Sequence, residues 1–198
     1  MNITNFTFKG EENLDINVYR WQSKIVAPKA IVQIAHGMSE TADRYEYFAK
    51  ELTANGYIVY INDHRGHGKT AKIIENIGYL AESEGFKCLV EDMNTLTNII
   101  KNENKDLPIY LFGHSMGSFA SQRYIMEYGN NLDGLILSGS NGKHGFILNI
   151  ADLVISNEIR KHGRRYRSKI VDTLIFGGNN RKFKLSRTEF DWLTRDNN

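Results

Sequence analysis

The sequence predicts an α/β fold with a mostly parallel sheet, and three observations carry that prediction. Short, almost uninterrupted runs of Val, Ile and Leu recur from residue 30 onward, as is typical of strands buried on both faces. Amphipathic segments with a helical period lie between these runs. Alternation of strand and helix in one chain indicates a parallel sheet covered by helices.

The first 22 residues have a different pattern. Segments 3–10 and 14–22 alternate apolar and polar residues on either side of the turn-rich stretch GEEN, which predicts an antiparallel hairpin. Apolar runs then predict buried strands within 30–37, 56–68, 108–115 and 132–140. The helical period predicts helices over 42–55, 86–102 and about 115–128, of which the first and third end at a glycine.

The strand–helix rhythm stops after Gly142. An amphipathic helix is predicted over 146–161, whereas the short apolar run 169–178 fits a helical turn or a strand equally well. Residues 144–198 carry 11 Lys and Arg against 6 Asp and Glu, while residues 1–143 carry 14 against 17. We therefore expect two parts, an α/β core at 1–142 and a helical region at 143–198 placed on the sheet.

Composition excludes several classes of protein. The formal net charge of +2 is too small to indicate a nucleic-acid partner. The single cysteine, Cys88, rules out an internal disulfide and fits a reducing compartment. The N-terminus lacks the basic and apolar regions of a secretory signal, and no apolar run approaches the roughly 20 residues of a membrane span. The expected location is the cytoplasm.

The stretch LFGHSMGSFA, residues 111–120, places Ser115 in a Gly-x-Ser-x-Gly turn between a predicted strand and a predicted helix. A nucleophilic serine needs a turn tight enough to hold its side chain clear, and Gly113 and Gly117 remove Cβ atoms that would clash there. The backbone N–H of Met116, at the helix N-terminus, would stabilise an oxyanion. The alternative is that Ser115 only caps the helix.

A second oxyanion donor is expected in the turn that ends the strand at 30–37. There the stretch IAHGMSE places Met38 after Gly37, and the N–H of Met38 is the predicted donor. The neighbouring His36 and His114 are expected to have structural roles. The stretch NDHRGHGKT, residues 62–70, matches no common set of metal ligands and contains no phosphate-binding GxxxxGK[ST] loop, so neither a metal nor a nucleotide cofactor is predicted.

The motifs AHGMSETADRY, DHRGHGKT and GHSMGS stand in that order at spacings of about 30 and 50 residues. Together they resemble the monoacylglycerol lipase and lysophospholipase branch of the α/β-hydrolases, the serine aminopeptidase-like family. The ending FGGNNRKFKLSRTEFDWLTRD resembles the cap region of bacterial lysophospholipases. The resemblance implies that Ser115 is the nucleophile and that Met38 and Met116 give the oxyanion amides. It also implies a cap from about residue 143, and ester hydrolysis without a cofactor.

The resemblance also implies that the catalytic Asp and His follow two further strands after the cap. The sequence ends at Asn198, so we expect an N-terminal fragment without these strands, inactive alone or completed by a second chain. The chain offers two possible substitutes for the missing residues. Asp152 and His162 lie ten residues apart on one predicted helix, about 15 Å along its axis, which is too far for a hydrogen bond. His144, after the last predicted strand, is the better candidate.

The expected substrate is a lipid ester, a monoacylglycerol or lysophospholipid. Apolar residues of the cap helix would contact the acyl chain or, with equal weight, only pack the cap on the core: Phe146, Ile147, Ile150, Leu153 and Val154. A basic run would approach anionic lipid headgroups: Arg160, Lys161, Arg164, Arg165 and Arg167. The alternatives are a short-ester esterase, a proline iminopeptidase-like hydrolase, or a non-catalytic remnant that binds a lipid or another subunit.

Overall fold

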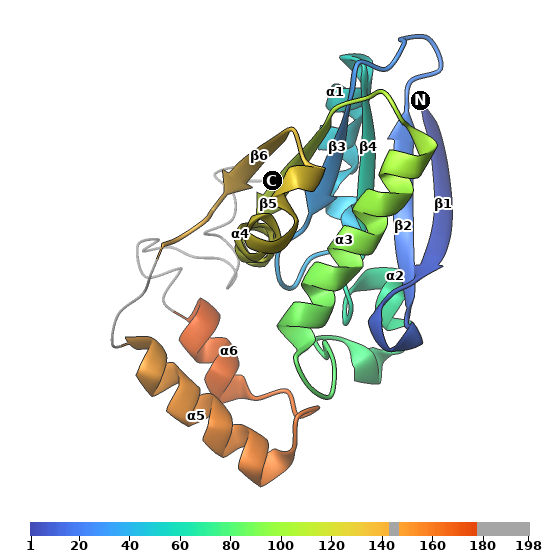
Figure 1. Ribbon diagram of the computed structural model, residues 1–198. Helices are drawn as coiled ribbons and strands as arrows, with labels where there is room; N and C mark the ends of the chain where they lie inside the picture. Colours follow the sequence, from blue (N-terminus) through green and yellow to red (C-terminus); the bar gives the residue numbers. More distant parts are fainter. Residues whose placement is uncertain (143–146, 178–198) are drawn as a thin grey trace, which may run out of the picture. The chain divides into compact units, whose positions relative to one another are not determined.

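The computed structural model describes residues 1–142 and 147–177 (Figure 1). The chain divides into two compact units, Met1–Gly142 and Lys143–Asn198. The first unit confirms the predicted fold class, because helices cover a sheet of six strands that is mostly parallel. These strands are β1 (Asn2–Lys9), β2 (Asp15–Gln22), β3 (Ala30–Ala35), β4 (Tyr57–Asn62), β5 (Ile109–His114) and β6 (Gly134–Ser138).

The strands lie side by side in the order β1-β2-β4-β3-β5-β6. The predicted N-terminal hairpin is confirmed, since β1 pairs antiparallel with β2 across a short 3-10 turn at Glu11–Asn13. Strand β2 also pairs antiparallel with β4. The remaining pairs, β4 with β3, β3 with β5 and β5 with β6, are parallel. The carboxyl ends of four parallel strands therefore meet at one edge of the sheet, where open α/β sheets bind ligands.

Helices cover both faces of this sheet. Helix α1 (Glu46–Ala54) packs on one face over Val32, Ile34, Val59 and Ile61. Helices α3 (Gly85–Glu103) and α4 (Met116–Tyr128) pack on the other face (Figure 1). The helix expected at 42–55 instead begins as a 3-10 turn at Ala42–Tyr45. The shorter elements are α2 (Gly68–Ala71) and 3-10 turns at Ile74–Asn76 and Gly129–Asn131.

The second unit contains two described helices. Helix α5 (Ile147–His162) confirms the predicted amphipathic helix, shifted by one residue. Helix α6 (Lys169–Phe176) settles the ambiguous apolar run as a helix. Ser168 explains where α6 begins, because its hydroxyl accepts a hydrogen bond from the N–H of Val171 (3.3 Å) and donates one to Glu158 of α5 (2.5 Å). Within the described ranges, no helix is long and apolar enough to cross a bilayer.

Candidate active site

Ser115 occupies a strained turn at the carboxyl edge of the sheet. Strand β5 ends at His114 and α4 begins at Met116, so the predicted strand–turn–helix is confirmed. Ser115 itself has φ 49° and ψ −117°. A positive φ of this kind costs a non-glycine residue on the order of 1–3 kcal/mol and persists only where the surroundings impose it. The N–H of Ser115 donates to the carbonyl oxygen of Ser138 in β6 (2.9 Å), which fixes the turn against the neighbouring strand.

The two glycines of the motif allow helix α4 to start directly against the strand ends. A Cβ at position 117 would lie 2.6 Å from the carbonyl oxygen of His36, which is closer than real Cβ contacts. A Cβ at position 113 would lie 2.7 Å from the carbonyl oxygen of Gly117. Any larger residue would therefore move α4 away from β3 or β5.

The loop after β3, residues 37–40, lies against Ser115. A Cβ on Gly37 would be 3.2 Å from the Cβ of Ser115. Three side chains hold this loop. Glu40 accepts a hydrogen bond from the N–H of Gly37, Nδ1 of His36 lies 2.7 Å from the Gly37 carbonyl oxygen, and Nε2 of His67 accepts from the N–H of Ser39 (3.4 Å). We call residues 37–40 the β3 loop below.

The two predicted oxyanion residues belong to the two segments that meet at Ser115. Met38 lies in the β3 loop, and Met116 is the first residue of α4. In the part of the chain that the structure describes, neither of their N–H groups donates to a protein acceptor. The amides of Gly37 and Ser39, by contrast, are both engaged.

Glu40 is a buried carboxylate beside this arrangement. Besides the Gly37 amide, it accepts hydrogen bonds from the Tyr45 hydroxyl (2.7 Å) and from Arg44 (2.6 Å). Burial alone would raise the pKa of Glu40, but the bonds from Tyr45 and Gly37 and the charge of Arg44 outweigh it, so its pKa is lowered. Glu40 was not predicted as a site residue, because a glutamate in a short polar loop gives no sign that it is buried.

The stretch NDHRGHGKT forms the scaffold behind the β3 loop. The carboxylate of Asp63 accepts from the backbone N–H groups of Ala42 and Lys69, each at 2.9 Å. Arg65 is fully buried, with Nε 2.7 Å from the Asp92 carboxylate of α3. In the described residues, no group of three or more His, Cys, Asp or Glu side chains is arranged to hold a metal ion.

Three histidines lie together under the β3 loop. The ring centre of His36 is 4.2 Å from that of His64 and 5.1 Å from that of His67. Burial lowers the pKa of all three rings, and that of His36 falls to about 4. The three imidazoles are therefore neutral at neutral pH.

The other candidate bases lie elsewhere. Nδ1 of His114 is 3.1 Å from the Ser138 hydroxyl, which supports its expected structural role. His162 stacks on Tyr166 at 4.3 Å and shares the uninterrupted helix α5 with Asp152, so these two remain as far apart as expected. His144 and Phe146 lie outside the described residues. Among the described histidines, none is hydrogen-bonded to the Ser115 hydroxyl.

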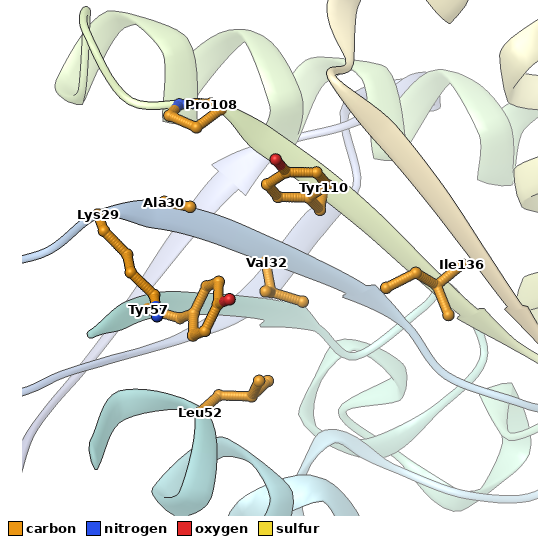
Figure 2. Close-up of a pocket in the computed structure, with 8 residues that line it drawn as sticks. All are labelled: Lys29, Ala30, Val32, Leu52, Tyr57, Pro108, Tyr110 and Ile136. Carbon is orange, nitrogen blue, oxygen red and sulfur yellow. The ribbon is translucent and has the colours of Figure 1, made fainter. Parts of the chain in front are cut away.

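A cavity of about 430 Å³ lies at the opposite end of the strands (Figure 2). Ala30 and Tyr57, at the amino ends of β3 and β4, and Pro108, just before β5, contribute to its wall together with Tyr110 and Ile136. Ser115 follows the carboxyl end of β5. This cavity therefore lies away from Ser115, towards the other end of the sheet.

A mostly parallel sheet, a serine on a strained strand-to-helix turn and an adjacent glycine loop define an α/β-hydrolase. Residues 26–198 match the family described as serine aminopeptidase, S33. The chain belongs to this family.

Several known proteins are similar to the chain. A monoacylglycerol lipase of Mycolicibacterium smegmatis is 37% identical over 112 residues, which cover 57% of this chain and 38% of that protein. Phospholipase YtpA of Bacillus subtilis is 30% identical over 119 residues, 60% of this chain and 43% of that protein. The structure of a thermostable carboxyl esterase from Bacillus coagulans, in complex with glycerol, has 28% identity and a TM-score of 0.84 and covers 97% of this chain and 61% of that one. The chain thus spans less than two thirds of the length of these relatives.

Proposed function

We propose that the complete protein is a serine hydrolase that cleaves carboxylic esters of lipids, with a monoacylglycerol or a lysophospholipid as substrate and the cytoplasm as its location. The observation that carries the proposal is the strained turn of Ser115 against the β3 loop. The amides of Met38 and Met116, which have no acceptor among the described residues, support it. Relatives named monoacylglycerol lipase and phospholipase, and a carboxyl esterase with 28% identity, support the choice of ester substrate.

In the proposed reaction, Oγ of Ser115 attacks the ester carbonyl carbon, and the negative charge on the carbonyl oxygen is stabilised by the amides of Met38 and Met116. The positive end of α4 adds to this stabilisation. The tetrahedral intermediate expels the alcohol, which takes up the proton that a base removed from Ser115. Water then hydrolyses the acyl-enzyme and restores the serine. We propose that the histidine base and its acid come from polypeptide outside the described residues.

We also propose that residues 143–198 form the cap over the acyl chain. The side chain of Leu153 on α5 is 72% exposed, which leaves apolar surface for a lipid. At the end of α5, the exposed residues Arg160, Lys161 and Arg164 give a cationic segment suited to anionic headgroups, and Arg165 and Arg167 extend it.

A second polypeptide is proposed to complete the fold along β6. This strand is parallel to β5 and forms the edge of the described sheet, and Ile136 and Leu137 are 51% and 39% exposed. Edges of parallel sheets are normally covered. Light scattering on the purified chain should show association with another polypeptide or self-association. A stable monodisperse monomer of 22.7 kDa would contradict this part of the proposal.

The catalytic proposal is tested by incubation with a fluorophosphonate, followed by intact mass under denaturing conditions and peptide mapping. An adduct on Ser115, absent in Ser115→Ala, shows an activated nucleophile, and a second chain in the same spectrum identifies the source of the base. Absence of an adduct in a correctly folded sample contradicts nucleophilic catalysis by this chain and supports the non-catalytic alternative, a protein that binds a lipid without turnover.

The name of the family, serine aminopeptidase, favours one competing function, cleavage of aminoacyl amides. Hydrolysis rates on glyceryl esters of long and short acyl length and on aminoacyl amides separate the candidates. Preference for a long-chain glyceryl ester supports the lipid proposal, whereas preference for a short ester or for an amide supports an esterase or an iminopeptidase-like enzyme.

A further inference from the structure

The hydrogen bonds of His36 define which of its ring nitrogens carries the proton. Nε2 of His36 accepts a hydrogen bond from the backbone N–H of His64 (2.9 Å). A neutral imidazole has one donor and one acceptor nitrogen, so the proton is on Nδ1. Nδ1 lies 2.7 Å from the carbonyl oxygen of Gly37 and therefore donates to it. His36 is fully buried, and water does not compete for this bond.

This bond fixes the orientation of one peptide unit of the β3 loop. The carbonyl of Gly37 and the N–H of Met38 belong to the same peptide group. That group is trans, so the two bonds point in opposite directions. Since His36 holds the carbonyl towards the buried histidines, the N–H of Met38 points away from them. A Cβ on Gly37 would lie 3.2 Å from the Cβ of Ser115, so this peptide group is close to the serine.

The peptide unit on the other side of Gly37 is fixed independently. The N–H of Gly37 donates to the buried Glu40 carboxylate, which removes this amide from the set of available donors. Met38 is followed by Ser39, whose N–H is directed to His67. Of the amides of Gly37, Met38 and Ser39, only that of Met38 has no acceptor among the described residues. Of the three contacts, only the one from His36 acts on the peptide group that contains the Met38 N–H.

We propose that His36 is a positioning residue for the reaction, which aims the Met38 amide at the oxyanion by donating from Nδ1 to the Gly37 carbonyl. This inference deepens the proposed function and rests on it. His36 does not touch the substrate, and His64 fixes its tautomer.

The proposal is tested by NMR on the isotope-labelled chain, with readouts that do not require turnover. Ring ¹⁵N shifts in the wild-type chain should show the Nδ1–H tautomer of His36. Residual dipolar couplings then give the direction of the Met38 N–H bond in three variants. His36→Leu removes the donor, and the direction should change. His36→Asn keeps an N–H at the position of Nδ1, and the direction should be retained. His64→Asn keeps the backbone N–H that donates to Nε2 of His36. It replaces a buried ring that, among the described residues, makes no hydrogen bond to the β3 loop, and is the matched control.

The rate of Ser115 phosphonylation provides the second readout. Removing one oxyanion donor lowers such rates by on the order of 100-fold, so His36→Leu should approach this loss while His36→Asn stays within about threefold of wild type. An Nε2–H tautomer in the wild-type chain overturns the proposal even if His36→Leu does not fold. An unchanged Met38 direction in a folded His36→Leu also overturns it. Absence of labelling in the wild-type chain contradicts an activated Ser115 in this chain and leaves the proposal for His36 to the couplings, which do not require turnover.

Discussion

Two turns meet at Ser115, and they are held in different ways. The turn between β5 and α4 is fixed by the backbone, through the positive φ of Ser115 and the missing Cβ atoms of Gly113 and Gly117. The β3 loop is fixed by buried side chains, chiefly His36 and Glu40. The turn between β5 and α4 tolerates no added side-chain volume. The conformation of the β3 loop depends on the charge state and the hydrogen-bond donors of His36 and Glu40.

The largest effect is expected from adding one methyl group to the turn between β5 and α4. In Gly117→Ala the new Cβ would lie 2.6 Å from the carbonyl oxygen of His36, and neither α4 nor β3 can yield without repacking. We expect a loss of about 4 kcal/mol in the free energy of unfolding and no phosphonylation of Ser115. Denaturant titration by circular dichroism measures the first effect.

Gly129→Ala, just after the other end of α4, is the control for this substitution. Its Cβ would meet only Ile125, at an ordinary 3.8 Å. Stability within about 0.5 kcal/mol of wild type is expected there. If Gly117→Ala and Gly129→Ala change the free energy of unfolding equally, the start of α4 does not pack closely against β3.

Acid should destabilise the β3 loop more than the turn between β5 and α4, because buried titratable side chains fix only the β3 loop. The pKa of His36 falls from 6.5 to about 4 in the folded chain, because burial and then the neighbouring His67 disfavour its charged form. A lowered pKa contributes stability above pH 6.5 that is lost as the pH falls towards 4, about 3 kcal/mol for His36 alone. Burial also lowers the pKa of His64 and His67, so they act in the same direction.

The contribution of His36 is isolated by comparing wild type with His36→Asn from pH 8 to pH 4. The carboxylates that face the histidines, Glu40 and Asp63, titrate in both proteins and cancel in the difference. The stability gap between the two proteins should shrink below pH 6.5. A gap that is constant with pH contradicts a neutral, buried His36.

The same contrast explains what could be predicted from the sequence. The hairpin, the four parallel strands and the turn at Ser115 were all predictable, because buried strands and tight turns restrict residue type locally. Helix α6 was ambiguous, since eight residues are too few for a period. The sequence did not predict the hydrogen bonds of Glu40 with Arg44 and Tyr45. They depend on how the β3 loop folds back onto the turn that precedes α1.

A smaller effect is expected when the carboxylate of the β3 loop is neutralised. Glu40→Gln keeps the size of the side chain but places an amide NH₂ among the donors Gly37, Tyr45 and Arg44, so one buried donor loses its acceptor. The expected cost is about 2 kcal/mol in the free energy of unfolding. Glu46→Gln, at an exposed i,i+4 pair with Lys50, should cost almost nothing. Equal costs would show that Glu40 is no more than a surface carboxylate.

The smallest effect has the opposite sign and concerns the strain at Ser115. Glycine adopts a φ of 49° without a Cβ penalty, so Ser115→Gly should stabilise the fold by about 1 kcal/mol even though it removes the proposed nucleophile. Ser115→Ala keeps the Cβ and its penalty, so its stability should match wild type. The difference between the two variants therefore measures the backbone strain at residue 115 less the extra unfolded-state entropy of glycine. If Ser115→Gly is less stable than Ser115→Ala, Ser115 is not strained, and the turn between β5 and α4 is held only by its flanking glycines.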